Sequence, residues 1–155
     1  MCWRRASSPS FEWERAARGS DNRAYPWGNS FSTGFANTKE SGIGALVQDG
    51  IYSGGNSQVG TFDMSGNAAE WTADSYLAYP GNSIPDSQYG TGLYVVRGGS
   101  FNTSSDKARV SARDPRDPNQ TYPDVGLRCV KDLPNQQTVV QIPNPRYTFY
   151  LSYKK

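Results

Sequence analysis

The sequence predicts a loop-rich α+β domain, in which one short helix and a few short strands are joined by long loops. The chain has 155 residues, a length that suits one domain. Glycine (16 residues) and proline (10 residues) are frequent, and only 35% of the residues are hydrophobic. Because 10 tyrosines and 4 tryptophans supply large rings, we expect a core that depends on aromatic side chains.

One helix is predicted over Phe11–Arg18, because acidic residues begin this segment and basic residues end it. That order complements the helix dipole. Trp13, Ala16 and Ala17 recur at helical spacing and form a narrow apolar face. Gly19 is a natural C-terminal stop. A helix of this length is marginal alone, so it must dock on the rest of the domain.

Two strands are predicted after residues 20–60, where no hydrophobic period persists and loops are expected. The first, Leu93–Arg97, is a β-branched and aromatic run that ends at two glycines. The second, Val125–Val130, places Leu127 and Cys129 on the same face. We therefore expect Cys129 to be a small, buried hydrophobic side chain.

The chain is predicted to comprise three parts, at residues 1–10, 11–132 and 133–155. The first is a doubtful N-terminus, the second is the folded domain, and the third is an extension after a turn-rich boundary. The extension contains two further strand patterns, Thr138–Ile142 and Tyr147–Tyr153. These patterns either add strands to the domain or belong to a neighbouring module.

Composition excludes several classes of function. The chain has no histidine, which excludes Ser-His-Asp triads and histidine-ligated zinc or iron within these residues. Two cysteines cannot build a four-cysteine zinc site or a disulfide framework. The formal charge is only +2 and no basic stripe is present, so the sequence gives no sign of nucleic-acid binding. No apolar run approaches the roughly 20 residues that a membrane span needs, and no signal peptide is visible, so the compartment stays open.

Five short motifs follow one another along the chain. They are E-W-E-R-A-A-R-G at 12–19, Y-P-W-G-N at 25–29, D-M-S-G-N-A-A-E-W at 63–71, R-G-G-S-F at 97–101 and G-L-R-C-V at 126–130. One such motif alone is a weak signal, but chance rarely supplies the whole ordered set. The set resembles the formylglycine-generating enzyme family, also called the sulfatase-modifying factor family.

The resemblance implies the C-type-lectin-like fold of that family over residues 11–132, with little regular structure and long packed loops. Members usually read Leu-Pro-Thr/Ser-Glu before the Glu-Trp-Glu motif, where this chain has Ser7–Phe11. Upstream, members have much more chain than the 10 residues present here. We therefore expect an N-terminally truncated or frame-shifted partial domain, whose helix lacks part of its packing surface.

The resemblance also implies where catalytic groups would lie. The oxidases of the family convert a cysteine of a sulfatase to formylglycine, using copper held by two cysteines. Those positions fall on Thr103 and near Ser105, and no cysteine lies between Trp3 and Arg128. Soft thiolates select Cu(I), whereas hydroxyls do not bind it usefully, so copper is not expected. Ser100 matches the family's active-site serine, although Gly-Gly-Ser is equally a turn signal.

Calcium is the expected metal. In residues 63–70, two carboxylates flank a Gly-Asn turn, and oxygen ligands in a flexible loop suit Ca²⁺. The resemblance implies a structural calcium site at Asp63, Gly66, Ala68 and Glu70, with the glycine and alanine acting through their carbonyls. It implies a second site at Asn37, Thr38, Asp49 and Ile51. The alternative is that Asp63 and Asn67 cap turns and that Glu70 pairs with an arginine.

Tryptophans and arginines in the motifs have two interpretations each. Three tryptophans are expected in the core, with a ring stripe for sugar binding as the alternative: Trp13, Trp27 and Trp71. Three arginines are expected to pair with acidic residues, with a ligand patch as the alternative: Arg97, Arg113 and Arg128. Their expected partners are Asp63, Asp74 or Asp114. The segment at 113–118 is expected to form a rigid exposed loop.

These observations predict a non-catalytic domain that binds a ligand, as one module of a larger protein. The expected partner is a protein or peptide, or a small polar ligand, on the loop face of residues 102–123, formed by Asn102–Asp106 and Asp114–Pro123. One alternative is an oxidase, or a relative of the sulfoxide synthases, whose catalytic parts are missing from this chain. Another is a structural component of a cell-surface or lipoprotein machinery, because fold does not fix function.

Overall fold

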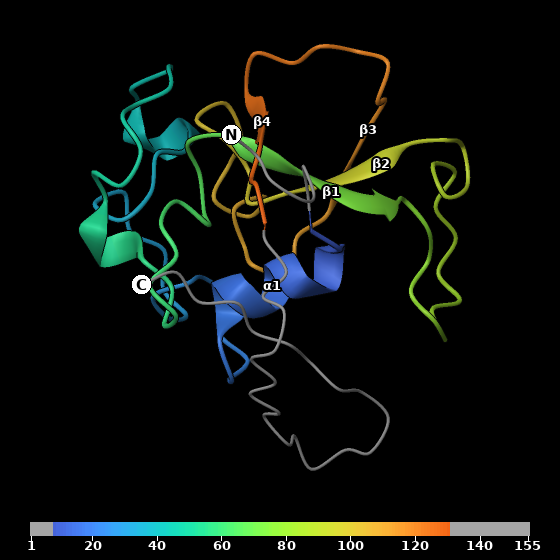
Figure 1. The fold of residues 1–155 in the computed structure, drawn as a ribbon, viewed down its shortest axis with the longest axis horizontal. Coiled ribbons are helices and arrows are strands. Elements are labelled where there is room, and N and C mark those ends of the chain that lie inside the picture. Colours follow the sequence, from blue (N-terminus) through green and yellow to red (C-terminus); the bar gives the residue numbers. More distant parts are fainter. Residues whose placement is uncertain (1–7, 131–155) are drawn as a thin grey trace.

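A four-stranded sheet, one α-helix packed against it and long loops on either side make up the fold (Figure 1). The computed structural model describes residues 8–130, so the strand patterns at 138–142 and 147–153 lie outside the described residues. The elements are α1 (Ser10–Arg18), the 3₁₀ turns η1 (Lys39–Ser41) and η2 (Ser53–Gly55), β1 (Ala69–Ser75), β2 (Tyr94–Arg97), β3 (Asp114–Arg116) and β4 (Val125–Leu127). A mixed sheet with so few helices confirms the predicted α+β class. Within residues 8–130, none of the helices has the length and apolar character that crossing a membrane requires.

The predicted helix is confirmed as α1, which begins one residue earlier than expected. The N–H of Gly19 donates to the carbonyl of Arg15 at 3.0 Å, and the positive φ of 74° at Gly19 turns the chain away. Trp13 and Ala17 are buried, and they pack with Met64 and Val110 in the core. The narrow apolar face of the helix is therefore the surface that docks on the domain.

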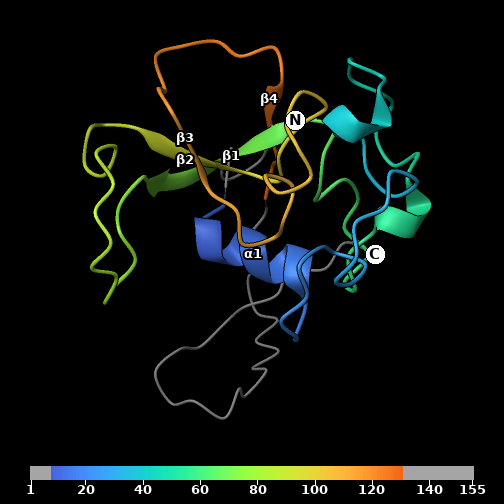
Figure 2. The same cartoon turned by 180° about the vertical axis from the view of Figure 1, so that it is seen from behind.

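The sheet has the strand order β3-β2-β1-β4, and α1 lies across one of its faces in both views (Figures 1 and 2). β1 pairs antiparallel with β2 and parallel with β4, while β3 pairs antiparallel with the other side of β2. This register places Glu70 opposite Arg97 on one side and opposite Gly126 on the other. The strands thus bring the third and last motifs of the sequence together.

Two of the strands were predicted and two were not. β2 confirms the strand expected at 93–97, and β4 confirms the first half of the strand expected at 125–130. β1 was missed because polar side chains interrupt its apolar pattern. β3 was expected to be an exposed loop, but it is a half-buried edge strand of sequence Asp-Pro-Arg. Proline is tolerated in an edge strand because such a strand pairs on one side only, so the missing N–H is not needed for a hydrogen bond to a second strand.

The expectation of a buried Cys129 is wrong. Cys129 is exposed and disulfide-bonded, and Leu127 is 57% exposed. Within the part of the chain that the structure describes, β4 is an edge strand that ends at Leu127, and Cys129 follows it beyond the sheet.

The aromatic core is smaller than expected. Trp13 is 2% exposed and confirms its predicted place, whereas Trp27 and Trp71 are only half-buried. Many of the fully buried side chains are aliphatic or polar instead, including Val95 and Val96 of β2. Most of the large rings lie in loops and contact one another there, and they contribute little to the centre of the domain.

Arg97 connects the helix to the sheet through a buried guanidinium whose side chain is 0% exposed. Its Nε donates to Ser10 Oγ at 2.8 Å, and one terminal nitrogen donates to Glu14 Oε2 at 2.7 Å. The other terminal nitrogen donates to the carbonyls of Val110 and Ala112, at 3.0 and 3.1 Å. A buried charge is stable only with such complete hydrogen bonding, so Arg97 fixes where α1 sits.

The expected aspartate partners of the arginines are wrong. Arg97 pairs with Glu14, and Arg128 pairs with Glu70. Arg113 stacks over a tyrosine ring and donates to a backbone carbonyl. Arg97 and Arg128 thus have acidic partners as expected, but these partners are glutamates, which tertiary contacts select.

Replacing Glu14 with glutamine tests the Arg97 network. We expect Glu14→Gln to lower the free energy of unfolding by about 2 kcal/mol, because it leaves a buried guanidinium without its counter-charge. Urea denaturation followed by tryptophan fluorescence measures the loss. The matched control is Asp21→Asn, which removes the ion pair between an exposed carboxylate and Arg23, and it should cost much less stability than Glu14→Gln. Equal losses in the two variants would contradict the role given to Arg97.

Candidate functional site

The loop that follows β2 carries the positions where the resembling oxidases hold copper. Ser100 is fully buried, and its hydroxyl donates to Asp124 Oδ2 at 2.7 Å. The hydroxyl of Thr103 accepts the Ser100 N–H at 2.8 Å and donates back to the Ser100 carbonyl at 3.2 Å. Thr103 therefore closes a tight turn through its own hydroxyl.

The next part of the loop is fastened by η1. The N–H of Lys39 donates to the Thr103 carbonyl at 2.9 Å. The carboxylate of Glu40 accepts the Ser105 N–H at 2.8 Å and the Thr38 hydroxyl at 2.6 Å. Thr103 is thus held through its hydroxyl and its carbonyl, whereas Ser105 is held through its backbone.

The Glu40 carboxylate has an unusually low pKa. Partial burial raises this pKa, but the hydrogen bonds from the Ser105 N–H and the Thr38 hydroxyl outweigh that effect and lower it to about 2. The charged form of Glu40 therefore persists far into the acid range and keeps the loop attached to η1.

Asp124 was missed by the sequence analysis. It is 6% exposed, accepts the hydroxyl of Ser100, and its backbone carbonyl accepts the Ala69 N–H at 2.9 Å. Asp124 thereby joins the starts of β1 and β4 to the Gly-Gly-Ser turn. Its only sequence signal is its position directly before the last motif, which does not distinguish it from an ordinary turn aspartate.

A cluster of four rings lies beside this loop. Tyr25 and Trp27 stack with ring centroids 5.2 Å apart, and Phe31 and Phe35 pack against them. The hydroxyl of Tyr25 donates to the Ser105 carbonyl at 3.3 Å. The second motif therefore supports the loop instead of filling the centre of the domain.

The loop face of residues 102–123 carries charges of both signs. Asp106 and Lys107 are exposed, and Arg109 pairs with Asp106 at 3.1 Å while lying 6.0 Å from the Tyr25 ring centroid. Residues 118–121 are exposed as well. The face thus offers polar and charged groups next to aromatic rings.

The first predicted calcium set lies in a tight turn whose carboxylates have protein partners. Asp63 has a φ of 53°, and its carboxylate accepts the Gly50 N–H at 2.6 Å. Glu70 accepts the Trp13 indole N–H at 2.7 Å and is bound by Arg128. Gly66 packs closely, because a Cβ there would lie 2.4 Å from the Asn37 carbonyl oxygen. Across residues 8–130, no three acidic or cysteine side chains converge as a ready metal site.

The second predicted set is divided between the interior and the surface. Asn37 and Thr38 are fully buried, whereas Asp49 and Ile51 are exposed. Asn37 accepts the Asn67 N–H at 2.6 Å through its carbonyl, which connects this set to the first one. Calcium at either set stays a prediction.

Arg128 lies between the two sets. Burial lowers the pKa of Arg128, but the Glu70 carboxylate, together with smaller effects of Asp63 and Asp49, outweighs this and raises it. The guanidinium also donates to the Phe62 carbonyl at 2.9 Å. A cation bound through Glu70 would therefore have to share that carboxylate with Arg128.

Comparison with known proteins identifies the domain. A family model described as "sulfatase-modifying factor enzyme 1-like domain" matches residues 6–133. The mouse (Mus musculus) protein named "Inactive C-alpha-formylglycine-generating enzyme 2" is 32% identical over 145 residues, which cover 82% of this chain and 43% of that protein. The "Formylglycine-generating enzyme" of Streptomyces coelicolor is 29% identical over 140 residues, covering 78% of this chain and 45% of the enzyme.

A solved structure has the same fold. The "Treponema denticola variable protein 1" superposes with a TM-score of 0.67 and 25% identity, over 77% of this chain and 45% of that one. This chain therefore spans less than half the length of each of these three relatives.

The hydrogen bond between Glu40 and Ser105 gives a pH-dependent prediction. Because the folded-state pKa of about 2 lies below the ordinary value of 4.5, the charged carboxylate stabilises the loop above pH 4.5, and this contribution is lost as the pH falls toward 2. The Ser105 amide resonance should therefore titrate near pH 2 in a ¹H–¹⁵N NMR series. Glu40→Gln should abolish that titration.

Asp106→Asn serves as the control, because Asp106 is exposed and carries its own ion pair with Arg109. This variant should leave the titration of the Ser105 amide unchanged. A midpoint near the ordinary glutamate value would contradict the assigned bond.

Proposed function

The chain belongs to the family of sulfatase-modifying factor enzyme 1-like domains, and from this membership we propose that it is a non-catalytic member that binds a ligand. The observation that carries the proposal is the pair Thr103 and Ser105 at the positions of the copper-binding cysteines. The hydroxyl of Thr103 and the backbone of Ser105 are both used to shape the loop. Neither supplies the soft ligand that Cu(I) requires.

The absence of suitable sulfur strengthens this proposal. Cys129 is the single cysteine among residues 8–130, and it is disulfide-bonded, so it offers no thiolate. The mouse relative carries the word "inactive" in its name, which is consistent with a family scaffold that has lost its chemistry. Other relatives are named as enzymes, so oxidation of a substrate peptide must be measured together with binding.

The loop face of residues 102–123 is the surface that we propose for binding. Its exposed groups carry both charges, and they lie beside the ring cluster that contains Tyr25 and Trp27. Such a combination suits a polar peptide, because backbone amides pair with exposed polar groups while a side chain contacts the rings. A protein or peptide is therefore the partner that this face fits best.

A sulfatase-derived peptide that contains the target cysteine tests binding and turnover together. We expect amide shifts confined to residues 102–123, no aldehyde on the peptide, and no stoichiometric copper retained after incubation with Cu(I). Arg109→Gln should weaken peptide binding, because it removes a half-exposed charge from the face. The control is Arg15→Gln, which removes a partly exposed arginine of α1, outside this face and its ring cluster.

Each remaining outcome contradicts part of the proposal. Aldehyde formation with bound copper would make the chain an oxidase. Shifts mapped outside residues 102–123 would refute the chosen face, and the absence of any shift would refute peptide binding.

We also propose structural calcium at the turn of residues 63–70, with a second ion at the set that includes Asp49. The support is the oxygen-rich turn with positive φ at Asp63 and Asn67, together with the carboxylates of Asp49, Asp63 and Glu70, which all act on the pKa of Arg128. The ion would tie loops together and would take no part in a reaction.

Calcium should raise the melting temperature by about 3 °C or more at millimolar concentration, relative to chelator, because a ligand bound only by the folded state stabilises it. Magnesium at the same concentration is the control and should act more weakly, since it prefers a smaller, more rigid site. Asp49→Asn should reduce the shift, because it removes a carboxylate ligand of the second ion. An unchanged melting temperature would refute calcium binding at both sets.

A further inference from the structure

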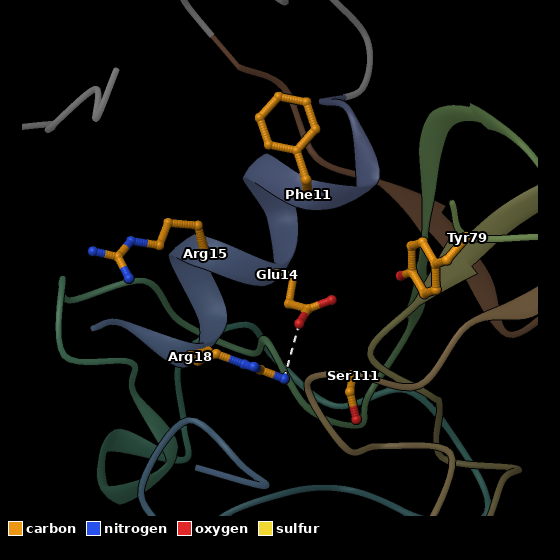
Figure 3. Close-up of a pocket in the computed structure, with 6 residues that line it drawn as sticks. All are labelled: Phe11, Glu14, Arg15, Arg18, Tyr79 and Ser111. Carbon is orange, nitrogen blue, oxygen red and sulfur yellow. Dashed lines mark ion pairs between the residues drawn. The ribbon is translucent and has the colours of Figure 1, made fainter. Parts of the chain in front are cut away.

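A pocket of about 350 Å³ lies between the outer face of α1 and the loop that joins β1 to β2 (Figure 3). Its lining residues are Phe11, Glu14, Arg15, Arg18, Tyr79 and Ser111. Four of them come from one helix, and the calcium and copper positions contribute none. This volume is at the lower end of the range for small-molecule sites.

The pocket has an apolar end and a polar end. Phe11 is 54% exposed and Tyr79 is 50% exposed, and their rings flank the pocket near the start of α1 (Figure 3). Arg18 and Ser111 lie toward the other end. Phe11 and Arg18 are seven residues apart, which corresponds to about 10 Å along a helix. A ligand that contacts both ends therefore needs a body several bonds long.

The polar end has more positive than negative charge. The two oxygens of Glu14 are taken by two different guanidiniums, with Arg18 at 2.8 Å and Arg97 at 2.7 Å. Arg15 adds a third positive charge at the rim. One carboxylate thus pairs with two guanidiniums, and Arg15, which points away from Glu14 in Figure 3, adds to the positive charge, so a net attraction for an anion remains.

Arg18 also retains unused hydrogen-bonding capacity. Its Nε is buried and donates to no acceptor in the described part of the chain. A buried donor without an acceptor is unfavourable, and a carboxylate is the strongest partner for a guanidinium edge. The hydroxyl of Ser111 offers a further donor at the same end.

We propose that this pocket binds a small organic carboxylate with an aromatic or branched apolar body. The carboxylate pairs with Arg18 beside Ser111, and the apolar body lies between the rings of Phe11 and Tyr79. The pocket needs both a negative charge and an apolar body, so neither a simple anion nor a neutral apolar molecule makes all of its contacts.

The probe is 3-phenylpropionate, which joins a ring to a carboxylate through a short chain. In a ¹H–¹⁵N NMR titration we expect saturable shifts at the lining residues, with a dissociation constant of about 1 mM, as befits a ligand of this size. The neutral amide 3-phenylpropanamide should bind about fivefold more weakly or worse, because it lacks the charge. Acetate, which lacks the ring, should bind more weakly still.

Two pairs of variants give matched controls. Arg18→Gln should weaken binding about fivefold or more, whereas Arg116→Gln should not. Arg116 has a similar exposure (29% against 26%), also pairs with one carboxylate, and also has a buried Nε without an acceptor. Phe11→Ala should weaken binding, whereas Phe62→Ala, at a phenylalanine of equal exposure, should not.

Ser111→Asp keeps the test decisive if Arg18→Gln does not fold. Ser111 is exposed, so the change should be tolerated, and its negative charge should weaken binding of the carboxylate while sparing the amide. Equal affinity for the carboxylate and the amide would overturn the proposal. So would the absence of shifts at the pocket up to about 20 mM probe, a concentration far above the expected constant.

Discussion

The buried guanidinium of Arg97 in β2 forms hydrogen bonds with the helix and with the loop after β2, so one charge connects the helix, the sheet and the loop. Ser10 and Glu14 of α1 accept from it on one side, and the carbonyls of Val110 and Ala112 accept from it on the other. A charge without solvent is stable only while all of these acceptors are in place. The position of the helix therefore depends on the position of the loop. The Gly-Gly-Ser turn directly follows Arg97, so the same hydrogen bonds fix where the turn begins.

Short polar side chains shape the neighbouring loop in the positions that thiols occupy in the oxidases. Thr103 closes the turn at Ser100, Asp124 holds the Ser100 hydroxyl, and Glu40 holds the backbone of Ser105. The hydroxyl of Thr103 makes bonds to the Ser100 backbone that a thiol would make only weakly, whereas Ser105 is held by a backbone N–H that any residue would supply. The proposed loss of copper ligation is therefore compatible with an ordered loop.

Local signals in the sequence predicted α1 and β2, because helix charge order, the stop at Gly19 and a β-branched run act over a few residues. The site depends on contacts that are distant in sequence. Glu14 meets Arg97 across 83 residues, and Glu40 meets Ser105 across 65. Which acid meets which arginine follows from the assembled sheet, so Glu14 was not expected as the partner of Arg97, whereas Glu70 was expected to meet an arginine only as the alternative to calcium. β3 was missed because its stability comes from pairing with β2 and not from its own residues.

The charge around Arg128 shows why an internal cation and a metal ion need not exclude each other. The Glu70 carboxylate, with smaller effects of Asp63 and Asp49, raises the pKa of this guanidinium. Glu70 alone is paired directly with it, and Asp63 instead accepts a backbone N–H. Arg128 therefore offsets the charge of Glu70, so the proposed calcium ion would depend chiefly on the two aspartates.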